Sequence, residues 1–170
     1  MGAPVAVSPA VHDLAHLAKR FTTSLLARPL TDGEQRWVSE QLLPGERLLW
    51  ARMSVADQRH AHGVAQQVHE RLREGASRPV LAAALLHDIG KIESGFGTLG
   101  RSAATVLANL GVTPASVKRY RQHNEIGRRL LEEAGSDPLT STWAYEHELP
   151  HEQWTLDPII AGALHHADDD

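Results

Sequence analysis

The adjacent pair His87-Asp88 is the part of the sequence best suited to chemistry. It ends an apolar run in the string LLHDIGK at residues 85–91, and Lys91 follows three positions after the aspartate. Imidazole and carboxylate groups are both metal ligands, and both are costly to bury without a partner. The pair therefore indicates a functional site at the end of a buried helix.

Composition limits what could hold a metal there. The chain of 170 residues suits a single domain and has no cysteine, so any ligands must be nitrogen and oxygen atoms. A formal charge of -4, from 17 basic and 21 acidic residues, argues against binding to duplex nucleic acid. The sequence has no apolar run of about 18 residues and no charged region before an apolar N-terminal stretch. We therefore expect no membrane association and a cytoplasmic location.

Hydrophobic residues recur with a period near 3.6, which predicts an all-α fold, a compact helical bundle. The apolar run at 79–88 has no polar face, which predicts the central helix, and glycines at 90, 95, 97 and 100 predict a loop after it. Thr31 and Glu34 have capping-box spacing. The predicted helices span residues 9–27, 31–43, 54–73, 79–88, 102–109, 114–134, 138–148 and 157–168, with a short helix carrying Leu48, Leu49 and Trp50.

Helical phase separates the histidines that face the core from those that face water. In the 54–73 helix, His60 shares a stripe with apolar residues at four-residue intervals, whereas His62 and His69 fall on the polar side. By the same reasoning, His123 and His147 lie on the buried faces of their helices. We expect the two residues on the polar side to be exposed.

Asp168 falls in the apolar stripe of the last helix, four residues after Leu164. A buried carboxylate without a partner is strongly destabilising, so an inward aspartate indicates a cation or a metal. If the last helix packs beside the central one, Asp168 could converge with His60, His87 and Asp88 on one divalent ion. Two imidazoles and two carboxylates suit Mn, Fe, Co, Ni or Zn, and Mg if water fills the remaining positions.

The sequence resembles the HD-domain metal-dependent phosphohydrolase superfamily. The resemblance rests on motifs that follow one another in the expected order: RHAHGVA at 59–65, ALLHDIGK at 84–91, HNEIG at 123–127 and ALHHAD at 163–168. It implies an HD-type domain over residues 54–170, and we expect residues 1–53 to form an N-terminal helical extension packed on the same domain. The extension matches nothing in the family and could form a lid, additional core or a surface for assembly into a homo-oligomer.

The resemblance also implies ligand sets for one or two ions. The first ion would be held by His60, His87, Asp88 and Asp168. Extra histidines bind a second ion in the binuclear branches, with the doublet aspartate as the bridge, and His123 and His147 stand in the corresponding places. A site for one ion, with these two histidines in the core or on the substrate, is the alternative.

The implied reaction is hydrolysis of a phosphate ester by metal-activated water, with Asp88 and Lys91 as catalytic residues. Lys91, Arg59 and Arg121 would bind the anionic substrate, a nucleotide or a related small phosphorylated metabolite. The Gly-Tyr-Pro signature of the branch that cleaves cyclic dinucleotides is missing, because Glu148 follows His147. A di-iron oxygenase on the same fold and a catalytically silent nucleotide sensor are alternatives. A His60–Asp168 hydrogen-bonded pair without metal is the structural alternative.

Overall fold

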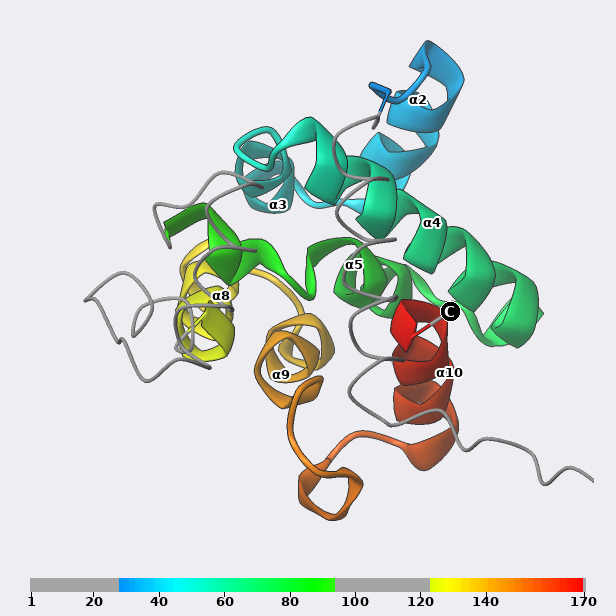
Figure 1. The fold of residues 1–170 in the computed structure, drawn as a ribbon, viewed down its shortest axis with the longest axis vertical. Coiled ribbons are helices and arrows are strands. Elements are labelled where there is room, and N and C mark those ends of the chain that lie inside the picture. The colour runs from blue at the N-terminus through cyan, green and yellow to red at the C-terminus, as the bar shows by residue number, and fades with distance from the viewer. Residues whose placement is uncertain (1–27, 94–122, 170) are drawn as a thin grey trace, which may run out of the picture.

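The computed structural model describes residues 28–93 and 123–169 (Figure 1). The α-helices in these ranges are α2 (Asp32–Gln41), α3 (Pro44–Trp50), α4 (Val55–Leu72), α5 (Arg78–Leu86), α8 (His123–Glu133), α9 (Pro138–Glu146) and α10 (Pro158–Asp169). Short 3-10 helices are η1 (Arg73–Gly75), η2 (Ile89–Glu93) and η3 (His151–Gln153). These ranges contain helices and no strand, which confirms the all-α prediction. The helices predicted at 9–27 and 102–109, and residues 114–122, lie outside the described residues.

The sequence signals at the helix starts operate as predicted. Thr31 caps α2, its backbone N–H donates to the Glu34 carboxylate at 2.6 Å, and its hydroxyl accepts from the Glu34 N–H at 3.4 Å. Ser54 caps α4 by accepting from the Asp57 N–H at 3.2 Å. Pro44 is the first residue of α3, where its missing N–H costs nothing, so it starts a helix as well as ending the previous segment.

Helix α5 is the centre of the bundle. It packs against α2, α4, α9 and α10, and it lies between them in Figure 1. Every residue from Val80 to Leu86 is buried. Because each fully buried Leu or Val side chain contributes about 1.5–3 kcal/mol, α5 is held firmly on all sides. Its C-terminal end is therefore a fixed platform for the His87-Asp88 pair.

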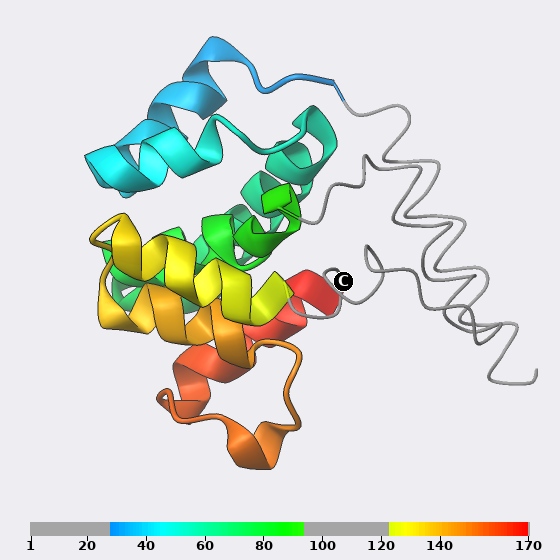
Figure 2. The same cartoon turned by 90° about the vertical axis from the view of Figure 1, so that its left-hand side faces the viewer.

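Two glycines let the segment after α5 touch α8. Gly90 lies in η2 and is buried, and a Cβ atom there would sit 1.8 Å from the His123 carbonyl oxygen. A Cβ on Gly127 would be 3.3 Å from the Gly90 nitrogen. Gly90 was predicted to belong to a loop, and this was wrong because contact with α8 winds residues 89–93 into a helix. In Figure 2, α8 in turn lies alongside α9.

Helix α2 covers a second side of α4. The Arg59 guanidinium bonds the Glu34 carboxylate at 2.6 Å and the carbonyl of Pro29 at 2.7 Å. Arg59, together with the Thr31 donors, lowers the pKa of Glu34 to about 2. These contacts fasten the start of α2 to α4.

The expected exposure of His62 was wrong, and α2 is the reason. His62 is only 8% exposed, and its ring meets Trp37 of α2 edge-on with centroids 5.6 Å apart. Burial lowers the pKa of His62, and Glu34 opposes this shift. His69, which also lies on α4, is exposed as predicted.

The described part of the N-terminal region shares the core of the rest. Leu30, Val38, Leu42 and Leu49 belong to the same buried cluster as the leucines of α5. The boundary at residues 53/54 stays a prediction. Among the described residues, no helix has the length and apolar character needed to cross a membrane.

We predict that Gly90→Ala destabilises the fold, because the new methyl group would collide with backbone rather than with a movable side chain. The expected loss is about 2 kcal/mol or more in the free energy of unfolding, measured by chemical denaturation. Gly162→Ala is the matched control, since a Cβ there meets nothing within 4 Å in the middle of α10. It should leave stability unchanged or raise it by up to about 1 kcal/mol. Equal stability of Gly90→Ala and the unmodified chain would contradict the close contact with α8.

Candidate metal centre

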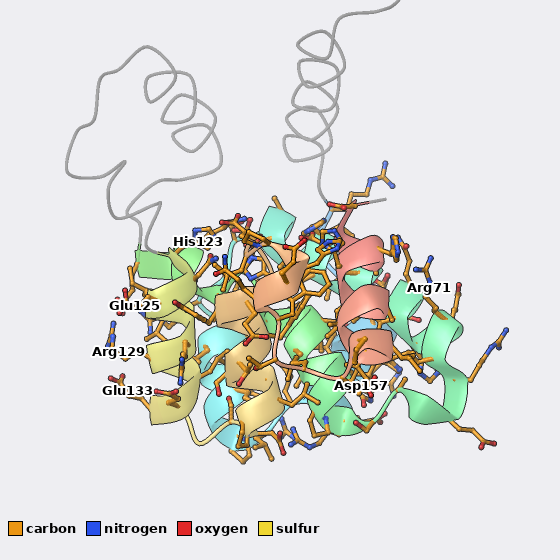
Figure 3. The ribbon with its side chains drawn as sticks, turned by 90° about the horizontal axis from the view of Figure 1, so that it is seen from below. Arg71, His123, Glu125, Arg129, Glu133 and Asp157 are labelled. Atoms are coloured by element: carbon orange, nitrogen blue, oxygen red, sulfur yellow. The ribbon has the colours of Figure 1, made fainter. Side chains whose placement is uncertain are left out.

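Side chains from five helices meet where the ends of α5, α8, α9 and α10 come together beside α4. The group consists of His60 on α4, His87 and Asp88 directly after α5, His123 on α8, His147 directly after α9, and Asp168 on α10. Figure 3 shows His123 at one end of α8, with Glu125, Arg129 and Glu133 spaced along the outer side of that helix. The structure thus brings together residues that are up to 108 positions apart in the chain.

The rings of His87 and His147 are held by their own helices. The Nδ1 atom of His87 lies 2.9 Å from the Ala84 carbonyl oxygen, and Nδ1 of His147 lies 3.3 Å from that of Trp143. A carbonyl only accepts, so Nδ1 carries the proton and Nε2 of the neutral ring presents a lone pair. Both Nε2 atoms are buried without a hydrogen-bond partner among the described residues. Metal-binding histidines are typically oriented in this way.

The Asp88 carboxylate lies between two sets of imidazoles. Its Oδ2 is 3.5 Å from Nε2 of His87, and its Oδ1 is 3.6 Å from Nε2 of His123 and 3.7 Å from Nε2 of His147. These separations are too long for good hydrogen bonds. They are close to the roughly 3.4 Å edge of a tetrahedron built on metal–ligand bonds of about 2.1 Å. The donor atoms are therefore spaced as ligands around shared cations would be.

Asp168 extends the group toward solvent. Its Oδ1 is 3.4 Å from Nε2 of His87 and 2.8 Å from Nε2 of His60. The side chains of His60 and Asp168 remain 37% and 26% exposed, so this side of the site is open. The 2.8 Å contact is an ordinary hydrogen bond, which satisfies this pair even without an ion. Nε2 of His87, in contrast, is buried without a hydrogen-bond partner among the described residues.

The carboxylates of Asp88 and Asp168 favour a positive charge in the group. Burial works against the charged form of His87, but the carboxylates of Asp168 and Asp88 outweigh it and raise its pKa well above the usual value. Burial likewise works against ionised Asp88, and Lys91 and His87 outweigh it, which places the pKa of Asp88 well below its ordinary range. The pKa of Asp168 is also lowered, against the effect of burial, by His87 and His60. A proton or a metal cation can supply the charge that these carboxylates require.

The basic residues predicted to bind substrate have different surroundings. The Lys91 ammonium pairs with Oδ2 of Asp88 and is largely buried, so it lies in the site. The Arg59 donors are engaged with Glu34 and with backbone carbonyls of residues 28 and 29, and a contact with substrate stays a prediction. Arg121 lies outside the described residues.

Within residues 28–93 and 123–169, two groups of side chains could hold an ion. One is His60, His87 and Asp88, with Asp168 in contact with both histidines, and the other is Asp88, His123 and His147. Asp88 belongs to both, with a different oxygen nearest each side. The structure therefore collects all the proposed ligands around two positions, and their binding of metal stays a prediction.

Sequence reasoning missed Glu148. Its Oε1 lies 3.6 Å from Nε2 of His123, at the edge of the second group. Its position directly after His147 was the available signal, since a residue next to a ligand is carried to the same place. The helix predicted at 138–148 included Glu148, but α9 ends at Glu146 and Glu148 lies in the following turn, so its direction does not follow helical phase.

We predict that the two groups bind metal independently enough to be separated by mutation. His87→Ala should abolish tight binding of the first ion, and His123→Ala should remove only the second, as measured by elemental analysis after gel filtration. His166→Ala is the control, because this imidazole is exposed two residues from Asp168. Circular dichroism verifies folding of each variant. An unchanged metal content in His87→Ala would contradict the assignment.

Comparison with known families agrees with this geometry. The model of the family described as "Cas3, HD domain" matches residues 47–169. Searches of curated proteins and of solved structures found no match to the chain. HD domains bind divalent metals, and the histidine and aspartate groups described above are suited to that role. The chain belongs to the Cas3 HD-domain family and is therefore a member of the HD-domain superfamily, a domain of the metal-dependent hydrolase type.

Proposed function

We propose that this protein is a metal-dependent phosphohydrolase that cleaves a phosphate ester. The observation that supports it best is the buried Asp88 carboxylate, flanked on both sides by imidazole Nε2 atoms at distances suited to shared ions. A nucleotide or a related small phosphorylated metabolite is the proposed partner.

His60, His87, Asp88 and Asp168 would hold one ion, and Asp88, His123 and His147 a second. When bound, divalent ions supply a nucleophilic water of lowered pKa and stabilise charge on phosphoryl oxygens. The protein's part is to orient the donor atoms and exclude water from the buried side. Because His60 and Asp168 are partly exposed, the substrate would approach from their side.

Lys91 would position the substrate. Its ammonium is held beside Asp88 by an ion pair and is only 13% exposed. A cation at this position can attract a phosphate oxygen and keep Asp88 ionised at the same time. Arg59 and Arg121 are the other proposed contacts, and Arg121 belongs to the residues outside the described ranges.

Hydrolysis of a phosphodiester in nucleic acid is a second candidate. The family match favours it, because the Cas3 HD domain is a nuclease-type HD domain. Phosphodiester and phosphomonoester hydrolysis place the same demands on the metal ligands. The net charge of -4 favours small substrates or single strands over a duplex.

The test is a substrate panel with the full chain loaded with Mn²⁺, Co²⁺, Ni²⁺ or Mg²⁺. The panel contains p-nitrophenyl phosphate, bis-p-nitrophenyl phosphate, nucleoside mono-, di- and triphosphates, and a single-stranded oligonucleotide. We expect metal-dependent release of phosphate or ester product, with turnover reduced at least about 100-fold in Asp88→Asn and Asp168→Asn.

Asp169→Asn is the control for the second of these variants, because Asp169 is exposed on the same helix and its carboxylate pairs with His165, which is outside both groups of proposed ligands. It should keep near-normal turnover. Failure of every metal-loaded preparation to cleave any phosphoester would contradict the proposed function, and cleavage confined to the oligonucleotide would select the second candidate.

A further inference from the structure

The turn after α9 carries a carboxylate to the edge of the second group of ligands. Glu148 Oε1 lies 3.6 Å from Nε2 of His123. Asp88 Oδ1 lies at the same 3.6 Å from that atom, and at 3.7 Å from Nε2 of His147. The Glu148 oxygen thus repeats the spacing of the other donors. It is too distant for a good hydrogen bond and suits an edge of a coordination shell.

The backbone under Glu148 is fixed. The Leu149 N–H donates to the Glu146 carbonyl at 2.8 Å, and the Trp154 indole N–H lies 2.9 Å from the same carbonyl and 3.0 Å from that of Leu149. The Glu146 carboxylate is buried and accepts from the N–H and hydroxyl of Thr155. These bonds fix the backbone on both sides of Glu148, so the fold places this residue within reach of His123.

The number of protein donors in each group and the local charge also favour metal binding by the Glu148 carboxylate. The first group has four protein donors, whereas the second has two imidazoles and an aspartate that it shares. Glu148 would give the second group a carboxylate of its own. Its Oε1 and Oδ1 of Asp88 approach the same nitrogen of His123, so a cation at this place would interact favourably with both carboxylates. With 55% of its side chain exposed, Glu148 leaves room for water and substrate.

We propose that Glu148 is a ligand of the second ion, together with Asp88, His123 and His147, and that it shifts this position toward ions that prefer oxygen. This inference rests on the proposed function. Oxygen donors suit Mn²⁺ and Mg²⁺, whereas imidazole suits Zn²⁺, Ni²⁺ and Cu²⁺. A mixed set with two carboxylates therefore binds Mn²⁺ better, relative to Zn²⁺, than a set with one.

The experiment is a titration of the full chain with Mn²⁺. Binding is measured by calorimetry and by the electron paramagnetic resonance signal of free Mn²⁺. Glu148→Gln keeps the shape of the side chain and removes the anionic ligand. We expect the first ion to bind unchanged and the second at least about 10-fold more weakly. Glu152→Gln, an exposed glutamate in η3, is the matched control and should titrate like the unmodified chain.

Glu148→His separates ligation from simple charge attraction, because it removes the charge and keeps a metal-binding atom. If Glu148 is a ligand, this variant still binds two ions, and competition between Mn²⁺ and Zn²⁺ at the second position shifts about 10-fold or more toward Zn²⁺. If Glu148 acts only through its charge, Glu148→His is as weak as Glu148→Gln, and the proposal is overturned. A Glu148→Gln titration that matches that of Glu152→Gln overturns it as well.

Failure of this inference can be distinguished from failure of the proposed function. Binding of one ion only by the unmodified chain removes the role of Glu148 but leaves hydrolysis at the first group intact. Two-ion binding that depends on Glu148, without turnover of any phosphoester, supports the ligand assignment and contradicts the proposed function.

Discussion

The structure depends on how one carboxylate is accommodated at the end of an entirely apolar helix. Asp88 follows the buried residues of α5 and is itself only 8% exposed. A carboxylate in this position requires compensating charge, and the fold surrounds it with Lys91 and with imidazoles from three directions. The same arrangement that makes ionised Asp88 tolerable gives it the geometry of a bridging ligand. Stability and chemistry thus impose the same demand on these residues.

The proposed ligands lie at or near the ends of helices. His87 and His147 are the C-terminal caps of α5 and α9, and Asp168 lies in the last turn of α10. The carbonyl-rich C-terminal ends of helices carry partial negative charge, which favours a cation nearby. The glycine contact between η2 and α8 brings His123 within reach of Asp88. The site is therefore built from rigid elements rather than from long loops, as a preorganised metal site requires.

The local sequence pattern was sufficient to predict much of this architecture. The 3.6-residue period and the caps located α4, α5, α9 and α10, and apolar stripes identified His123 and His147 as buried. Phase reasoning assumes one buried face per helix, and it failed at His62 because α2 covers a second face of α4. It could not anticipate that Gly90 touches α8, or that Arg59 faces Glu34, since both depend on tertiary neighbours. Glu148 was missed because a turn has no helical phase.

The most direct test of the central claim is anomalous X-ray scattering from crystals of the protein saturated with Mn²⁺. The account predicts one peak at about 2.2 Å from Nε2 of His87 and from an Asp88 oxygen, and a second peak on the His123 side of the same carboxylate. It would be contradicted by saturating Mn²⁺ that leaves no peak within bonding distance of His87 and Asp88. In that case, the histidines and aspartates would serve only as a buried hydrogen-bonded cluster.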